Sequence, residues 1–160
     1  MIQTVTLLII AVLVGIDQLI KYAVASNLEV GDACLQIPHF IEIRYLRNYG
    51  GMMGTFDNKS TVLAVITIVI ILVGIGAIIF KKIKPGFVYV CITMILAGGI
   101  GNLIDRLALG YVIDYINVLF VDFYIFNFAD CLVTVGAFLL IFYEIYEIIR
   151  EFKQKRKENV

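Results

Sequence analysis

The chain has 160 residues, of which 61% are hydrophobic and 16% are charged, and its mean hydropathy is +0.96. A soluble domain carries roughly 25% charged residues, so this composition argues against an ordinary soluble fold and favours a membrane protein. The 13 basic and 13 acidic side chains cancel at pH 7, which leaves no positive charge to indicate a nucleic-acid-binding protein.

The first apolar stretch, at about residues 5–25, is long enough to cross roughly 30 Å of hydrocarbon as a helix. Ala23-Val24-Ala25 resembles the cleavage site of a secretory signal peptide. However, no basic residue precedes the apolar run, and Asp17 and Lys21 interrupt it just before that site. We therefore expect a retained helix, on which Asp17 and Lys21 share one face and can form an ion pair.

The segment 26–60 contains one strand signal. From His39 to Arg47, apolar and polar residues alternate, which is typical of a half-buried strand. Asn48-Tyr49-Gly50-Gly51 follows directly as a turn signal. His39 is the only histidine of the chain, and a single histidine in such a segment is more often a surface residue than a ligand.

Three further apolar stretches, at about 61–80, 87–104 and 128–149, complete four expected membrane spans within a single domain, residues 1–160. Basic residues crowd the turn between the second and third spans and the C-terminal tail: Lys81, Lys82, Lys84, Arg150, Lys153, Lys155, Arg156 and Lys157. Because lysine and arginine in short connections stay cytoplasmic, both termini are expected inside, with segments 26–60 and 105–127 outside.

The outer segment from Gly110 to Phe128 is unusually apolar for a loop. It is rich in tyrosine, phenylalanine, valine and isoleucine, with Asp114 and Asp122 among them. We expect such a loop to lie on the membrane or to pack over the helices.

Polar residues gather at the outer ends of the spans, where ionisable groups at membrane depth indicate function by default. They are Asp17, Lys21, Asn102, Asp105, Arg106, Asp114, Asn127 and Asp130. Asp17 with Lys21 and Asp105 with Arg106 are adequately explained as structural ion pairs. Asp114 and Asp130 have no basic residue within four positions, so a catalytic role competes with a turn residue and a helix N-terminal acid, respectively.

Other catalytic chemistries lack the residues they need. One histidine cannot supply the H-E-x-x-H motif of a zinc protease, and Ser26 and Ser60 lie at span ends without a nucleophile-elbow sequence. Cys91 and Cys131 lie in apolar helices, where the thiolate is disfavoured. An enzyme would therefore use paired carboxyls that share one proton, one activating a water and the other protonating the carbonyl oxygen or the leaving amine.

Two non-proteolytic alternatives stay open on this reasoning. A small ion-coupled transporter with an acidic relay would place its acids near mid-membrane and have short loops on both sides. This chain instead has its acids at one end, beside two sizeable outer loops. A non-catalytic membrane scaffold would leave the paired asparagines and acids without a purpose.

Five short stretches, in order along the whole chain, resemble the bacterial lipoprotein signal peptidases, also called signal peptidase II. They are Asp17-Gln18-Leu19-Ile20-Lys21, Arg47-Asn48-Tyr49-Gly50, Gly98-Gly99-Ile100-Gly101-Asn102-Leu103-Ile104-Asp105-Arg106, Val112-Ile113-Asp114-Tyr115 and Phe126-Asn127-Phe128-Ala129-Asp130. Each is weak alone, but five in sequence form a specific match.

The resemblance implies an all-α membrane protein with four transmembrane helices and a small extracytoplasmic β-sheet cradle. It implies an aspartic endopeptidase of the bacterial cytoplasmic membrane that needs no metal or other cofactor. Such enzymes cleave diacylglyceryl-modified prolipoproteins just before the lipidated cysteine, act among membrane lipids, and are blocked by the peptide antibiotic globomycin.

Residue by residue, the resemblance makes Asp114 and Asp130 the catalytic dyad. Substrate-binding or supporting positions are Asp17, Lys21, Asn48, Gly50, Asn102, Asp105, Arg106 and Asn127. One departure follows Asn48-Tyr49-Gly50, where the family usually has small residues and then an aromatic, whereas this chain has Gly51-Met52-Met53. Because methionine fills irregular spaces, we expect a changed pocket lining and a changed inhibitor fit there.

Overall fold

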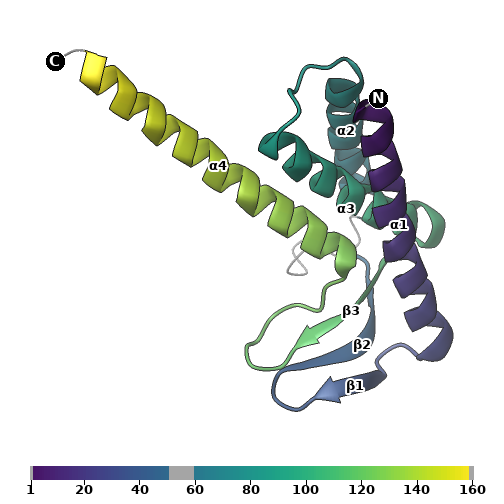
Figure 1. Ribbon diagram of the computed structural model, residues 1–160. Coiled ribbons are helices and arrows are strands. Elements are labelled where there is room, and N and C mark those ends of the chain that lie inside the picture. The colour runs from purple at the N-terminus through teal and green to yellow at the C-terminus, as the bar shows by residue number, and fades with distance from the viewer. Residues whose placement is uncertain (1, 51–59, 159–160) are drawn as a thin grey trace.

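Four long apolar helices and one small sheet make up residues 2–50 and 60–158, the part of the chain that this computed structural model describes (Figure 1). The elements in chain order are α1 (Ile2–Asn27), β1 (Ala33–Ile37), β2 (Ile41–Asn48), α2 (Ser60–Ile79), α3 (Phe87–Leu109), β3 (Val112–Val118) and α4 (Phe128–Glu158). The Gly51-Met52-Met53 segment lies outside the described residues.

Each of the four helices is long and apolar enough to cross a membrane, which confirms a multi-pass membrane protein with a small sheet. Helices α1, α3 and α4 extend beyond the predicted spans 5–25, 87–104 and 128–149. α3 continues to Leu109, where Gly110 ends it in the left-handed conformation (φ 80°) that glycine adopts without strain. Asp105 and Arg106 therefore belong to the helix and not to the following loop, because hydropathy marks the apolar run and not the helix end.

The sheet is antiparallel in the order β1-β2-β3. The strand predicted at His39–Arg47 is found as β2. The interpretation of Gly110–Phe128 as a loop is wrong for Val112–Val118, which forms β3 and pairs with β2 so that Leu46 faces Asp114. β3 is buried from Val112 to Tyr115, so it lacks the alternation of a half-exposed strand.

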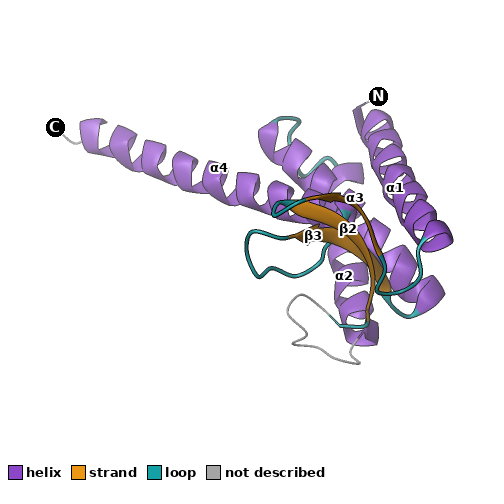
Figure 2. Ribbon diagram, turned by 90° about the horizontal axis from the view of Figure 1, so that it is seen from below, coloured by secondary structure: helices purple, strands orange, loops and turns teal. Residues whose placement is uncertain are grey.

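The sheet lies across the end of the helix bundle where α1 ends and α4 begins (Figure 2). A cluster of buried apolar side chains joins them, with Val24 of α1 packed with Tyr45 of β2 and with Ile113 and Tyr115 of β3. This packing brings the polar residues of β2 and β3 close to the polar residues at the neighbouring ends of the helices.

α3 packs against each of the other three helices. Its closest approaches depend on glycine, because a Cβ at Gly98 would overlap the carbonyl oxygen of Ala129, and one at Gly101 would lie 2.6 Å from Oδ2 of Asp17. Small residues at such crossings let helix backbones pack closely within a membrane. α3 therefore sets the distance between α1 and the start of α4.

Candidate active site

The first turn of α4 fixes Asp130 through a reciprocal capping arrangement. Oδ1 of Asn127 accepts a hydrogen bond from the backbone N–H of Asp130 (2.9 Å), and Oδ2 of Asp130 accepts one from the backbone N–H of Asn127 (3.1 Å). This is the capping box that satisfies free amides at a helix N-terminus. The i,i+3 spacing of the two residues therefore lets them orient each other's side chains within a single turn.

Asp114 comes from β3 and meets that helix end. Its side chain is 1% exposed, and Oδ1 accepts a hydrogen bond from Nδ2 of Asn127 (2.6 Å). Its Oδ2 accepts one from Nδ2 of Asn48 (2.8 Å), at the end of β2, while the N–H of Gly50 donates to Oδ1 of Asn48 (3.0 Å). Asn127 thus contacts both carboxyl-bearing residues, Asp114 through its amino group and Asp130 through its cap.

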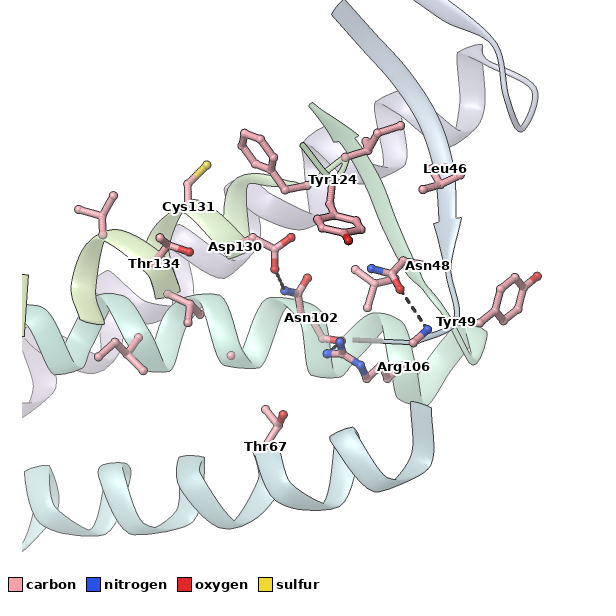
Figure 3. Close-up of a pocket in the computed structure, with 18 of the residues that line it drawn as sticks. Leu46, Asn48, Tyr49, Thr67, Asn102, Arg106, Tyr124, Asp130, Cys131 and Thr134 are labelled. Atoms are coloured by element: carbon pink, nitrogen blue, oxygen red, sulfur yellow. Dashed lines mark hydrogen bonds between the residues drawn. The ribbon is translucent and has the colours of Figure 1, made fainter. Parts of the chain in front are cut away.

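Asn102 of α3 supports the other face of Asp130. Its Nδ2 donates to Oδ1 of Asp130 (2.7 Å; Figure 3), and its Oδ1 accepts from Lys21 Nζ (2.9 Å) and Asn127 Nδ2 (3.0 Å). Because an ammonium can only donate, the amide oxygen must face Lys21, which turns the amino group toward Asp130. The orientation of Asn102 is therefore determined by its neighbours.

Three buried charges lie behind these amides. Lys21 Nζ lies 2.9 Å from Oδ2 of Asp17 and 3.0 Å from Oδ2 of Asp105, and all three side chains are at most 2% exposed. The predicted pairing of Asp17 with Lys21 is therefore present. The predicted pairing of Asp105 with Arg106 is wrong, because adjacent helical residues point in different directions and Asp105 faces α1.

Burial changes the acidity of Asp114. Desolvation, with a smaller contribution from the charge of Asp130, raises the pKa of Asp114 from its ordinary value of 3.8 to about 7. Hydrogen bonds from Asn48 and Asn127 act in the opposite direction by stabilising the carboxylate. A carboxyl that exchanges its proton near neutral pH is suited to general acid–base chemistry.

A cavity of about 800 Å³ opens beside these groups (Figure 3). Asn48, Asn102, Arg106 and Asp130 line its polar end, whereas Asp114 lies behind Asn48 and Asn127 and is not among the lining residues. Its walls are mainly apolar and come from three helices, the sheet and the segment before α4. The helices contribute Thr67, Ile70 and Ile71 of α2, Ile95, Leu96 and Gly99 of α3, and Cys131, Val133, Thr134 and Val135 of α4. The sheet and the segment before α4 contribute Leu46, Val112, Phe123, Tyr124, Ile125 and Phe126.

Arg106 brings a positive charge to this cavity. Its Nη1 donates to the carbonyl oxygen of Asn102 (3.3 Å), and its buried Nε has no hydrogen-bond partner within residues 2–50 and 60–158. The guanidinium therefore has donors to offer to a bound molecule. All ten predicted site residues fall in or directly behind this one region, but only part of them line the cavity.

One supporting residue was not predicted. Gln18 Nε2 donates to the carbonyl oxygen of Gly101 (3.1 Å) and to Oδ1 of Asp105 (3.0 Å), and so links α1 to α3. Its place beside Asp17, one turn before Lys21, was the available signal, but an uncharged glutamine in an apolar run did not stand out.

The amino-acid sequence of this chain is similar to a family model and to known proteins over most of its length. A family model described as signal peptidase (SPase) II matches residues 9–146. The lipoprotein signal peptidase of Streptococcus pneumoniae (strain R6) is 36% identical over 142 residues, covering 87% of this chain and 91% of that protein. The lipoprotein signal peptidase of Staphylococcus aureus (strain JH9) is 36% identical over 162 aligned positions, covering 97% and 94%.

The fold of this chain is similar to the folds of two solved structures. A bacterial membrane enzyme determined by the in meso method at 2.3 Å resolution superposes with a TM-score of 0.83 at 35% identity, covering 91% of this chain and 90% of that one. A second, at 1.9 Å resolution, gives a TM-score of 0.77 at 36% identity, covering 87% and 91%.

Proposed function

The chain belongs to the signal peptidase II family, and on that basis we propose that Asp114 and Asp130 are the catalytic dyad of a lipoprotein signal peptidase. It is an aspartic endopeptidase that removes signal peptides from prolipoproteins. The observation that carries the dyad assignment is the position of Asn127, which donates to one carboxyl and caps the helix turn that holds the other. On this proposal, residues 1–160 form one peptidase domain.

The two carboxyls divide the chemistry between them. With its pKa raised to about 7, Asp114 carries the shared proton near neutral pH, and Asp130, which lines the cavity, takes a proton from the attacking water. As the water oxygen bonds to the scissile carbonyl carbon, Asp114 gives its proton to the carbonyl oxygen, which requires the Asn48 side chain that covers Asp114 to turn aside when substrate binds. Asp130 then protonates the leaving amine, the C–N bond breaks, and Asp114 recovers a proton from the tetrahedral intermediate, which restores the starting state.

We propose that the substrates carry a diacylglyceryl group on cysteine and are cut just before that residue. The mainly apolar cavity walls support this, because they extend from the polar end along α2, α3 and α4, where lipid chains and an apolar signal peptide can be buried. Prolipoprotein and membrane lipid are then the partners of the chain. The transporter alternative is not favoured, because the acids meet at one end of the helices beside the sheet.

Purified protein is expected to cleave a diacylglyceryl-modified prolipoprotein at least about tenfold more efficiently than the same peptide without lipid. Burying only about two methylene groups, at roughly 0.8 kcal/mol each, accounts for a factor of ten. Comparing kcat/KM for the two peptides tests the substrate class, with the Asp114→Asn protein as the blank. Equal cleavage of both peptides would show that the lipid is not recognised.

Replacing Asn48 by Ala is expected to extend activity to higher pH. Activity needs a proton on the dyad, so kcat/KM falls as pH rises through the pKa of Asp114, near 7. The hydrogen bond from Asn48 lowers that pKa, and its loss raises the pKa, which moves the alkaline limb upward. The limb is measured from kcat/KM at about pH 5 to 9, and a shift to lower pH would contradict the assignment of the proton.

We also propose that both chain ends face the cytoplasm and that the active site faces outward, at the bacterial cytoplasmic membrane. Lysine side chains in the turn between α2 and α3 and basic residues at the end of α4 support this orientation. With the three native cysteines replaced by alanine, a membrane-impermeant thiol reagent should label Asp122→Cys in intact cells. It should label Lys82→Cys only after permeabilisation, and the reverse pattern would overturn the orientation.

Globomycin is expected to inhibit this enzyme by occupying the same cavity, since the chain is a member of the family that this antibiotic blocks. The Gly51-Met52-Met53 departure lies next to Gly50, which is part of the cavity wall. Inhibition therefore gives a measure of how that segment alters the fit, when it is compared between this chain and a variant carrying the family's small residues there.

A further inference from the structure

Three buried charged side chains lie behind the dyad without lining the cavity. Asp17 and Lys21 come from α1 and Asp105 comes from α3, and each is at most 2% exposed. A buried ion pair is weak support for stability, because the desolvation of its charges offsets much of their attraction. Three such charges at the depth of a membrane-spanning helix therefore call for a more specific explanation than stability.

Each of the two acids binds the backbone next to one catalytic residue. Oδ1 of Asp17 accepts a hydrogen bond from the N–H of Ala129 (3.0 Å), the residue before Asp130. Oδ2 of Asp105 accepts one from the N–H of Ile113 (3.0 Å), the residue before Asp114. The two contacts are equivalent in kind, although β3 and the first turn of α4 are unrelated elements.

Lys21 joins the two acids. Its ammonium contacts both carboxylates, and its third donor goes to Oδ1 of Asn102, whose amino group holds Asp130. Gln18 adds a parallel link, with Nε2 donating to Oδ2 of Asp17 (3.2 Å) and Oδ1 of Asp105 (3.0 Å). One continuous network therefore connects the backbones that carry the two dyad residues.

We propose that Asp17, Lys21 and Asp105 form a clamp that sets the separation of Asp114 and Asp130 and the electrostatic field in which the pair ionises. The inference rests on the proposed dyad and makes the three side chains positioning residues, since they act on the dyad through the backbone next to it and through Asn102. Displacing a reacting group by about 1 Å costs on the order of 10²-fold in rate. A clamp that holds both backbones from one point would prevent such a displacement.

The charges of the clamp make its effect on pH directional. The groups that face the dyad are Lys21 from α1, Asn48 from β2, Asn102 and Arg106 from α3, Tyr115 from β3, and Asn127 and Cys131 from α4. Asp17 and Asp105 lie behind them, on the backbone N–H groups of Ala129 and Ile113. Removing the positive charge of Lys21 disfavours the ionised form of the dyad. The acid limb of the pH profile of kcat therefore moves to higher pH. Removing either negative charge of the clamp moves that limb to lower pH.

The experiment measures kcat, KM and the acid limb for Asp17→Asn, Asp105→Asn and Lys21→Met in the full-length protein with lipidated substrate. We expect kcat to fall about 10- to 100-fold with KM within about twofold. The acid limb should move on the order of one pH unit, upward for Lys21→Met and downward for the two asparagine variants. A neutral clamp carrying all three changes buries no unpaired charge and should also move the limb downward.

Thr6→Val is the matched control, because Thr6 is buried in the same helix and its Oγ1 donates to Tyr89 of α3 (3.3 Å), away from the site. It should lower the melting temperature without moving kcat or the acid limb. If the clamp variants behave like this control, the clamp is only structural and the inference fails. If Asp114→Asn and Asp130→Asn keep normal turnover, the dyad itself is wrong, which is a separate outcome. If Lys21→Met does not fold, the two asparagine variants and the neutral clamp still test whether the clamp acts on the dyad.

Discussion

Asp114→Asn and Asp130→Asn are each expected to reduce cleavage of a lipidated prolipoprotein by about 10³-fold or more. A positioned general acid or base contributes about 10²- to 10⁴-fold, and in the proposed mechanism each carboxyl acts in both halves of the reaction. An asparagine cannot take the proton of the attacking water or return it to the leaving amine. The loss should appear in kcat, measured on purified protein with substrate above KM.

The two variants should remain folded. An amide in place of Asp114 removes a buried carboxyl, and its oxygen can still accept a hydrogen bond from Asn48 or Asn127. Asp130→Asn keeps an oxygen that can accept from the backbone N–H of Asn127. Asp122→Asn, in the exposed part of the same outer segment, is the control and should leave cleavage unchanged. Near-normal turnover in either dyad variant, with the protein folded, would refute the assignment.

Gly98→Ala is expected to destabilise the protein by about 1–3 kcal/mol and to slow cleavage on the order of 10²-fold. The added methyl group would overlap the carbonyl oxygen of Ala129 and lie 2.8 Å from Cγ2 of Val133. Replacing a helical glycine by alanine gains about 0.5–1 kcal/mol in conformational entropy, which is less than the cost of the overlap. Since Ala129 precedes Asp130, relief of the overlap by moving α4 displaces a carboxyl of the proposed dyad.

Gly76→Ala is the comparison for this effect. Gly76 lies in α2, and no heavy atom comes within 4 Å of the position its Cβ would take. It should keep or slightly raise the melting temperature and retain full turnover. Thermal unfolding and kcat measured on both variants distinguish the effect of steric overlap at the α3–α4 contact from the effect of alanine on helix propensity. If Gly98→Ala matched Gly76→Ala in both quantities, the α3–α4 contact would not control the site.

The surroundings of Asp114 and Asp130 differ in a way that supports the different roles proposed for them. Asp130 is held by a local cap and by Asn102 and lines the cavity, whereas Asp114 is buried behind two asparagines. Burial raises the pKa of Asp114 to about 7, so this carboxyl keeps its proton to near neutral pH. The proposed roles, Asp114 as the acid and Asp130 as the base, therefore follow from the burial of Asp114 and from the position of Asp130 on the cavity wall.

Local features of the sequence determined the membrane spans and the residue types of the site. An apolar run long enough for hydrocarbon is a property of consecutive residues, so the four helices could be predicted with errors only at their ends. The Asn127–Asp130 spacing likewise determines how these two side chains are oriented, because a capping box forms within one turn. The Asp17–Lys21 pair is local in the same way.

Only the tertiary structure decided which of these residues meet. The short apolar segment Val112–Val118 has no pattern that distinguishes a covered strand from a loop, and its pairing with β2 is what carries Asp114 to Asn127. Asp105 has Arg106 beside it in sequence but Lys21 beside it in space, because helix geometry turns neighbours apart and the α1–α3 crossing supplies the partner. Contacts between distant segments depend on how whole helices and strands pack. The spacing of residues along one helix or strand does not determine that packing.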